Sequence, residues 1–304
     1  MRVIVAGGTG FIGRPLCRAL AEEGHTAVVL TRNPAAARGR LGPGVEAELW
    51  EPGQAGDWQR TLNGADGVIN LAGESIAGGR WTARQKAAIR DSRVLGTRSL
   101  VEAIGRAQNR PKVLVNASAV GYYGPRGDEP VDETGPPGDD FLARVCQEWE
   151  REARAAEAYG VRVALVRTGV VLGEQGGALE KLLLPFKLFV GGPTGSGRQG
   201  FPWVHLDDVV GIYRWALEND AVSGPLNATG PEAIDNRQFC QIVARVLSRP
   251  CWLPAPAFAL RLALGEMADA LLLSGQKVSP VRTELLGYQF QFGSAEAALE
   301  DVLR

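Results

Sequence analysis

The stretch RVIVAGGTGFIG, residues 2–13, carries the strongest signal of fold class in this chain. Its first five residues are mostly the apolar and β-branched types of a buried strand, and Gly7, Gly10 and Gly13 follow directly. One glycine allows a tight turn into a helix, one lets the backbone approach a pyrophosphate, and one lets helix and sheet pack closely. The helix N-terminus favours the phosphate charge. The stretch predicts a dinucleotide-binding turn, and a glycine turn without a ligand is the alternative.

Short strand-like runs alternate with longer helical patterns through the first half of the chain. Further strands are expected at 27–31, 45–49, 67–71, 113–116 and 161–167. Helices are expected from about residue 11, over 82–107 and over 141–159. This βαβ rhythm predicts an α/β fold of the Rossmann type, with a doubly wound parallel sheet.

The sequence changes character after Gly173. Glycines and prolines punctuate 191–200, a helix is expected over 207–218, and the tail is mostly helical. We expect residues 1–173 to form a dinucleotide-binding domain and 174–304 to form a smaller, substrate-side region, partly interleaved with it. Ligands of doubly wound folds sit at the carboxyl ends of the strands, so the loop at 191–200 is expected to be mobile until a ligand binds.

Composition disfavours several classes of protein. Lys and Arg number 33 against 34 Asp and Glu, so the charge supports neither nucleic acid nor an anionic membrane as a partner, and a small molecule is the default. The apolar segment 258–273 is interrupted by charges, which predicts a packed amphipathic helix, and 35–40 is expected to be a surface loop. The four cysteines have neither disulfide-framework nor metal-site spacing: Cys17, Cys146, Cys240 and Cys251. No export signal is visible, so we expect a cytoplasmic protein, with a homodimer as one option for its assembly.

The end of the second strand carries Thr31, Arg32 and Asn33. NAD-selective proteins usually place an acid about 20 residues beyond the glycine motif, where it binds the ribose hydroxyls. The Arg32 guanidinium matches a 2′-phosphate in charge and in fork geometry, so NADP(H) is the expected cofactor. A solvated loop arginine is the alternative.

The glycine motif, Thr31-Arg32, the NLAG run at 70–73 and the strand-end Ser118 together resemble the extended short-chain dehydrogenase/reductase superfamily. Further motifs are similar to its atypical "epimerase family" branch: NLAGESI at 70–76, RW at 80–81, SRV at 92–94, RTGVVLG at 167–173, the run 195–205 and SGQKV at 274–278. Members are often labelled nucleoside-diphosphate-sugar epimerases or cell-division inhibitors, and carry a small C-terminal domain of unknown function. The resemblance spans nearly the whole chain.

The resemblance implies where a cofactor would lie. Leu71 and Ala72 would flank its adenosine side, and residues 167–170 would lie below the nicotinamide. Arg93 stands where relatives have a cofactor-facing asparagine, so it would bind the pyrophosphate or another anion, with a helix-surface salt bridge as the alternative. The full expected cofactor set is Gly7, Thr9, Gly10, Phe11, Ile12, Gly13, Thr31, Arg32, Leu71, Ala72, Gly73, Arg93, Arg167, Gly169 and Val170.

The acid/base residues of the superfamily are incomplete here. Relatives that oxidise or epimerise sugars use a strand-end Ser or Thr and then a Tyr followed four positions later by a Lys, whose charge lowers the phenol pKa from about 10. Ser118 is present, but 140–149 reads DFLARVCQEW, without either residue. Ser118 and Tyr122 are therefore the candidate catalytic residues, although Tyr122 has a structural loop aromatic as its alternative.

Two readings of function stay open on the sequence alone. One is an NADP(H)-dependent oxidoreductase or epimerase with a non-standard acid/base group. The other is a non-catalytic NADP(H)-binding sensor or regulatory module. His205 beside Asp207 could act as an acid/base pair, but a structural role is favoured because Asp207 is expected to cap a helix. No metal site is expected.

Overall fold

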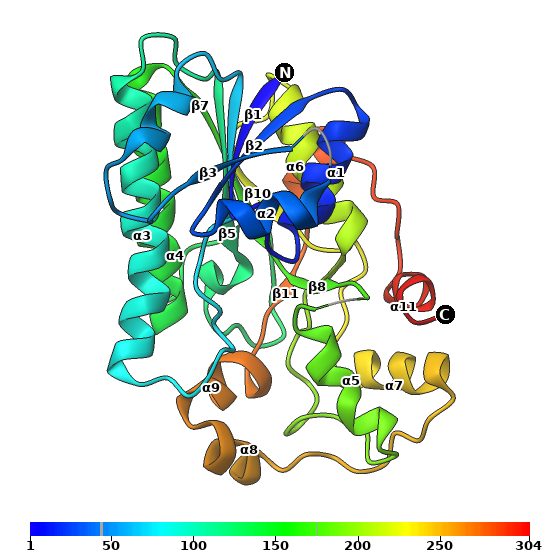
Figure 1. Ribbon diagram of the computed structural model, residues 1–304. Helices are drawn as coiled ribbons and strands as arrows, with labels where there is room; N and C mark the ends of the chain where they lie inside the picture. Colours follow the sequence, from blue (N-terminus) through cyan, green and yellow to red (C-terminus); the bar gives the residue numbers. More distant parts are fainter. Residues whose placement is uncertain (43–44, 175) are drawn as a thin grey trace.

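The computed structural model describes residues 1–42, 45–174 and 176–304, and its central element is a parallel sheet (Figure 1). Within those ranges the sheet has seven strands in the order β3-β2-β1-β4-β5-β7-β10. They are β1 (Arg2–Ala6), β2 (Thr26–Thr31), β3 (Val45–Leu49), β4 (Gly67–Asn70), β5 (Val113–Ala119), β7 (Arg162–Thr168) and β10 (Gly224–Ala228). The order reverses between β1 and β4, as in a doubly wound Rossmann sheet. The predicted α/β fold is confirmed.

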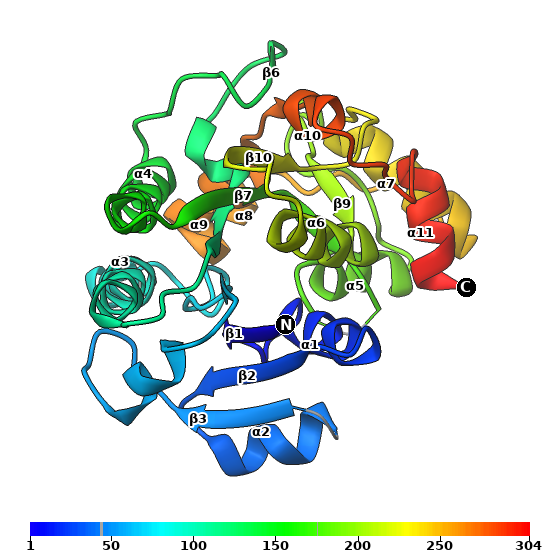
Figure 2. The ribbon, with the colours of Figure 1, turned by 90° about the horizontal axis from the view of Figure 1, so that it is seen from above.

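Helices cover both faces of this sheet (Figure 2). α3 (Ala83–Arg106) and α4 (Phe141–Arg154) lie on one face, whereas α1 (Gly13–Glu22) and α6 (Leu206–Glu218) lie on the other. The central strands between these layers are buried on both sides and are nearly all apolar, as parallel strands usually are. Each fully buried aliphatic side chain stabilises the fold by about 1.5–3 kcal/mol. The loops at the carboxyl ends of the strands therefore stand on a rigid base.

The C-terminal region consists mainly of short helices, and it contributes one strand to each of two short strand pairs. The helices are α5 (Leu179–Lys187), α7 (Asn236–Leu247), α8 (Ala257–Leu264), α9 (Glu266–Ala268), α10 (Val281–Leu285) and α11 (Ala295–Leu303). The strand pairs are β8 (Val170–Leu172) with β9 (Trp203–His205), and β6 (Pro130–Val131) with β11 (Lys277–Val278). The main sheet takes its last strand, β10, from beyond residue 173, so the two halves of the chain share one core.

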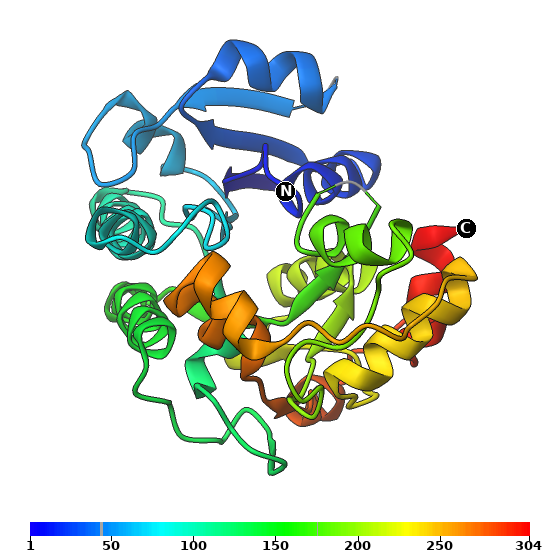
Figure 3. The same ribbon diagram turned by 90° about the horizontal axis from the view of Figure 1, so that it is seen from below.

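The segment 258–273 does not form the packed amphipathic helix that the sequence predicts, so this prediction is wrong. The chain forms α8 and α9 on either side of Gly265, followed by a π-helical turn, and α8 buries none of its residues. Phe258 and Leu262 are 74% and 78% exposed. Figure 3 shows this segment, in orange, lying across the carboxyl edge of the sheet. Arg80 donates to carbonyls of α8, and the apolar residues that the segment buries, Met267 and Ala268, belong to α9.

Residues 34–41 form α2 (Pro34–Leu41), so the surface loop predicted over 35–40 is also wrong. Two start signals account for the helix. Asn33 Oδ1 accepts a hydrogen bond from the amide of Ala36 at 3.0 Å, and Pro34 stands at the first helical position. Among the residues described, no helix is both long enough and apolar enough to cross a bilayer.

Candidate functional site

The turn between β1 and α1 is tightly packed except on one side. Gly7 has a φ of +80°, a left-handed value that glycine adopts without strain, and its carbonyl accepts from the Gly10 amide at 3.0 Å. A Cβ at Gly7 would lie 2.9 Å from the carbonyl carbon of Leu71, and a Cβ at Gly13 would collide with the Gly7 carbonyl. For Gly10, the Gly7 oxygen is the only neighbouring atom that the described residues place within 4 Å of such a Cβ. The side of the turn at Gly10 is open to a ligand.

The first turn of α1 leaves amide donors without a side-chain acceptor. Its N-cap residue, Ile12, has helical dihedral angles and makes no side-chain capping bond. The Phe11 ring packs against Gly173 and Gly177, which have no side chains to displace it. Thr9 lies inside the same turn. Unpaired amides at a helix N-terminus, together with the helix dipole, favour a phosphate group at this position.

Arg32 is exposed at the carboxyl end of β2. The backbone around it is held in place, because Thr31 Oγ1 accepts from the Asn33 amide at 3.3 Å and Asn33 caps α2. Across residues 1–42, 45–174 and 176–304, no hydrogen bond or ion pair of the Arg32 guanidinium is formed. This cation is therefore available to an anionic ligand at the edge where the glycine turn opens.

Arg93 reaches from α3 to the carboxyl end of β4. Its Nη1 donates to the carbonyl oxygens of Glu74 at 2.9 Å and Ile89 at 3.0 Å, and the guanidinium lies 5.2 Å from the centre of the Trp149 ring. Burial lowers the pKa of this guanidinium. In the part of the chain that the structure describes, Arg93 makes no ion pair, so the helix-surface salt bridge that the sequence left open is not formed.

A cluster of buried amides links the strands β4 and β5 to the helices α3 and α4. Asn70, the last residue of β4, donates from Nδ2 to Asn116 Oδ1 at 2.7 Å and to Thr97 Oγ1 at 2.8 Å. Trp149 Nε1 donates to the same Thr97 hydroxyl at 2.9 Å. Sequence analysis missed this cluster. Its signal is an asparagine at the end of each of two neighbouring apolar strands, VIN and VLVN.

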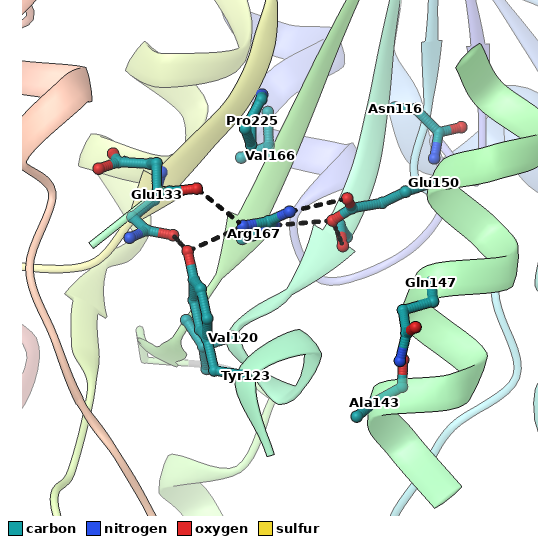
Figure 4. Close-up of polar contacts among 12 residues, drawn as sticks. Asn116, Val120, Tyr123, Glu133, Ala143, Gln147, Glu150, Val166, Arg167 and Pro225 are labelled. Atoms are coloured by element: carbon teal, nitrogen blue, oxygen red, sulfur yellow. Dashed lines mark hydrogen bonds and ion pairs between the residues drawn. The ribbon is translucent and has the colours of Figure 1, made fainter. Parts of the chain in front are cut away.

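Arg167, at the end of β7, forms a buried ion pair with Glu150 of α4 (Figure 4). Its Nε and Nη2 donate to the two carboxylate oxygens at 2.8 and 2.9 Å, and both side chains are at least 94% buried. Burial opposes the charge on Arg167, but the hydrogen bonds and charge of Glu150 outweigh it and raise the pKa of the guanidinium. Ser118 Oγ donates to the same carboxylate at 2.7 Å. An ionised carboxylate only accepts, so Ser118 directs its proton at Glu150.

Two neighbouring tyrosines pack on the other side of Arg167. The Tyr123 hydroxyl accepts from Arg167 Nη1 at 3.0 Å and donates to Asn227 Oδ1 at 2.7 Å, and burial raises its pKa to about 12. The Tyr122 ring stacks on the guanidinium, with 3.5 Å between Cζ and the ring centre. The predicted pair Ser118 and Tyr122 is thus brought to one arginine, whereas the roles of Glu150, Tyr123 and Asn227 were missed.

Residues 3–228 match the family model described as the NAD dependent epimerase/dehydratase family. This chain belongs to the NAD-dependent epimerase/dehydratase family. The match runs from β1 to β10 and therefore covers the whole parallel sheet. Residues 255–302 match a domain of unknown function, DUF1731, and include the exposed helix α8.

Several proteins named as epimerase family members are similar to this chain over its full length. Epimerase family protein SDR39U1 homolog, chloroplastic, from Arabidopsis thaliana is 43% identical, over 100% of this chain and 87% of its own. Epimerase family protein YfhF from Bacillus subtilis is 40% identical, over 100% and 98%. The crystal structure of human epimerase family protein SDR39U1 (isoform 2) with NADPH is 39% identical, covers 99% of both chains and has a TM-score of 0.88.

In this family member, the part of α4 where the resemblance predicts a Tyr-Lys dyad has other residues. Figure 4 shows Ala143 and Gln147 on α4, ahead of Glu150. Gln147 Nε2 donates to the Gly138 carbonyl at 2.9 Å and so ties the helix to the preceding loop. Ala143 carries no polar side-chain atom. The charged group that α4 directs at Ser118 is the Glu150 carboxylate, an anion.

The remaining predicted cofactor contacts lie at the carboxyl ends of β4 and β7. Leu71 and Ala72 pack against the backbone of Gly7, as the glycine geometry requires. The Val170 amide donates to the Pro202 carbonyl at 2.6 Å, and a Cβ at residue 169 would collide with that same carbonyl. The glycine at 169 therefore has a packing reason that is independent of any ligand.

His205 has a structural position. Its Nδ1 accepts from the Asp207 amide at 3.1 Å and caps α6, so the prediction that Asp207 is the N-cap is wrong. Asp207 sits in the first helical turn, where its charge favours the positive end of the helix dipole. The imidazole is buried and packs on the Phe292 ring at 3.8 Å. These contacts favour the structural alternative for this histidine.

The loop at 191–200 borders two grooves. One has a volume of about 550 Å³ and is lined by this loop, Arg237 and Trp252. The other, about 300 Å³, lies between this loop and the segments 125–128 and 273–275. Arg198 lines both grooves. Both grooves lie in the region that the sequence predicts to bind the substrate. The mobility of the loop stays a prediction.

One group of side chains in the described ranges has the make-up of a metal site. Ligand atoms of Glu23, His25 and Glu218 lie within 4.8 Å of one another. Glu23 pairs with Arg214, and the imidazole contacts both Glu218 and the N-terminal amine of Met1. The group lies at the amino ends of β1 and β2, at the opposite edge from the glycine turn. It is not connected with the candidate site.

Proposed function

We propose that this chain binds NADP(H) across the carboxyl ends of β1, β2 and β4. The observation that carries the proposal is the uncapped first turn of α1 behind Gly10, with the unpaired Arg32 at the end of the neighbouring strand. The α1 amides suit the pyrophosphate, and Arg32 suits a 2′-phosphate. The human relative of 39% identity, crystallised with NADPH, supports this choice of cofactor.

The proposed contact set follows the carboxyl edge of the sheet. Gly7, Thr9, Gly10, Phe11, Ile12 and Gly13 hold the pyrophosphate; Thr31 and Arg32 hold the 2′-phosphate; Leu71, Ala72 and Gly73 flank the adenosine side; Gly169 and Val170 lie below the nicotinamide. Arg167 acts as a positioning residue in this set, because Glu150 and Tyr123 already occupy its donors.

The proposed activity is that of an NADP(H)-dependent oxidoreductase or epimerase-like enzyme without a Tyr-Lys dyad. When bound, the nicotinamide exchanges a hydride. Ser118 directs its proton at Glu150, so it offers a substrate a lone pair and not a proton. A phenol without a nearby lysine can donate its proton at neutral pH but is a poor base. Tyr122 is therefore proposed as the proton donor, which favours the reduction of an activated carbonyl or conjugated system.

A substrate screen followed by NADPH absorbance tests this activity. Ordinary UDP- and GDP-sugars should be converted no faster than background, because general acid/base catalysis is worth about 10²–10⁴ in rate. Activated carbonyls and conjugated enones should be reduced, and Tyr122→Phe should lower that rate more than Ser118→Ala. Robust sugar-nucleotide epimerisation would overturn the proposal, whereas reduction unaffected by both substitutions would overturn only the roles of these residues.

A non-catalytic NADP(H)-binding sensor or regulatory module is the second candidate. The observation in its favour is a buried chain of hydrogen bonds, in which Glu150 joins Ser118 to Arg167 and Arg167 joins Glu150 to Tyr123. A sensor should bind NADPH tightly and show no turnover across the screen. A partner protein that binds the NADPH-loaded form more tightly than the NADP⁺-loaded form would support this candidate.

The setting of the protein is also a proposal. We infer a cytoplasmic protein. Its net charge of −1 favours a small molecule as the partner over a nucleic acid or a membrane. A homodimer is the proposed assembly. Light scattering coupled to gel filtration measures the mass in solution, and a monomer at micromolar concentration would rule the dimer out.

A further inference from the structure

Arg93 has an unused pair of donors. A guanidinium binds an oxyanion best through the fork formed by Nε and Nη2, which can donate two parallel hydrogen bonds. The contacts of Arg93 with the Glu74 and Ile89 carbonyls both use Nη1. In the described ranges neither Nε nor Nη2 donates to a protein acceptor, and neither atom is among the fully buried polar atoms without a partner. Among the described residues the fork is unpaired, and neither of its atoms is fully buried.

The surroundings of this fork are arranged for an anion. Gly73 leaves the guanidinium room, because a Cβ there would lie 2.9 Å from Cζ, 3.1 Å from Nη2 and 3.2 Å from Nε. The two carbonyl contacts fix the head group, and the Trp149 ring lies beside it. Burial lowers the pKa of Arg93, which reflects the cost of holding a cation away from water. A partly buried cation with no carboxylate partner is stabilised most by an anionic ligand.

Arg93 reaches the carboxyl edge of the sheet from the face opposite to α1, and its head group lies against Gly73 there. The uncapped amides belong to α1, on one face of the sheet, and Arg93 belongs to α3, on the other (Figure 2). Arg93 contacts Trp149 of α4, and the next residue of that helix, Glu150, binds Ser118. An anion at Arg93 would thus lie on the same face of the sheet as Glu150, the partner of the candidate catalytic residue Ser118.

We propose that the Arg93 fork binds a carboxylate or phosphate group of the substrate, so that the substrate is anionic. This inference rests on the proposed function, because it places the anion beside the same site. It assigns Arg93 to an anion other than the pyrophosphate, whereas the cofactor set expected from the sequence includes this residue. The substrate would then be a conjugated or carbonyl compound with an acidic group a few bonds from the reducible centre.

The test is calorimetric titration of oxalate and of inorganic phosphate into the protein, with and without saturating NADP⁺. Arg93→Gln keeps the length and polarity of the side chain but removes the charge, and should weaken the binding of one of these anions at least about tenfold. Arg93→Lys keeps the charge without the fork and should weaken binding less. Arg90→Gln is the matched control, because Arg90 is a neighbouring α3 arginine paired with Glu148 and Asp91.

Affinity for NADPH distinguishes the two proposals. We expect Arg93→Gln to change the dissociation constant of NADPH less than about threefold while anion binding is lost. A tenfold loss of NADPH affinity, or anion binding that is equal in Arg93→Gln and in Arg90→Gln, would overturn the assignment of Arg93. Failure of the unmutated protein to bind NADPH would instead overturn the proposed function, and the titration without NADP⁺ would still report on Arg93.

Discussion

Arg167 and Arg93 both lie near the carboxyl edge of the sheet, and they differ in what meets the fork of Nε and Nη2. In Arg167 the fork is filled by the Glu150 carboxylate, and in Arg93 it has no protein acceptor among the described residues. A filled fork inside the protein fixes neighbouring side chains, whereas an open one is free to bind a ligand. The comparison assigns Arg167 to the architecture of the site and Arg93 to recognition.

The largest expected difference between the two arginines is in stability. Arg167→Met leaves the Glu150 carboxylate buried without its partner, which should lower the free energy of unfolding by about 3–5 kcal/mol. Arg93→Met removes two hydrogen bonds to carbonyls but leaves no buried carboxylate unpaired, so it should lower the free energy of unfolding by a smaller amount, about 1–2 kcal/mol. Urea denaturation measures both values. Adding Glu150→Gln to Arg167→Met should recover part of the lost stability. Equal losses of stability in Arg167→Met and Arg93→Met would contradict the difference between the two arginines.

The filled fork also predicts a pH dependence at Tyr123, which hydrogen-bonds to Arg167. Burial raises the pKa of Tyr123 to about 12, against about 10 in an unfolded chain. The unfolded state loses this proton first, so the stabilisation is complete below about pH 10 and is lost as the pH rises towards 12. Relative to Tyr123→Phe, the unmutated chain should lose up to about 3 kcal/mol of stability over that interval. If the stability of the unmutated chain and that of Tyr123→Phe changed equally with pH, the fold would not be holding the Tyr123 phenol neutral.

Arg32 extends the comparison to an exposed arginine. Arg32→Ala should remove most of the preference for NADPH over NADH, about tenfold, because the charge-assisted pair with a 2′-phosphate is lost. The free energy of unfolding of the Arg32→Ala variant should stay within about 0.5 kcal/mol of the unmutated value, as for most surface substitutions. Titration of both cofactors and urea denaturation give the two numbers. An unchanged preference would assign the selectivity to another residue.

The smallest expected effect is at the exposed helix of the C-terminal region. Leu262→Ser in α8 should change the free energy of unfolding by less than about 0.5 kcal/mol, because the side chain is 78% exposed. Leu20→Ser in α1 is the matched control, since that leucine is fully buried and its loss should cost at least about 2 kcal/mol. A large loss of stability in Leu262→Ser would show that α8 packs against another part of the protein, or against a second molecule, in solution.

Most of the sheet was predictable because its strands are apolar runs punctuated by glycine turns. β10 was not predicted, since its residues, GPLNA, read as a turn. It is an edge strand that pairs only with β7, and an edge tolerates a proline that a central strand would not. α8 illustrates the opposite error, because an apolar composition does not tell whether a surface is available to cover it.

The glycine turn was predictable because local backbone geometry dictates its residues, whereas the Arg167 network joins residues far apart in the sequence. Glu150 looks like any of the neighbouring charged residues of α4. The phase of the helix could have distinguished it, because the buried residues Cys146 and Ala153 lie one turn before and one turn after Glu150. No local signal pairs it with Arg167 or Ser118, and that pairing depends on the order of the strands.

The central claim is that the open side of the glycine turn holds NADP(H), and one calorimetric titration tests it directly. The unmutated protein should bind NADPH at least about tenfold more tightly than NADH, since a charge-assisted pair contributes on the order of 1.5–3 kcal/mol. Gly10→Val should abolish the binding of both while the chain stays folded, because the new side chain would fill the space beside the α1 amides. Equal affinity for NADPH and NADH, or full NADPH affinity in Gly10→Val, would contradict the account.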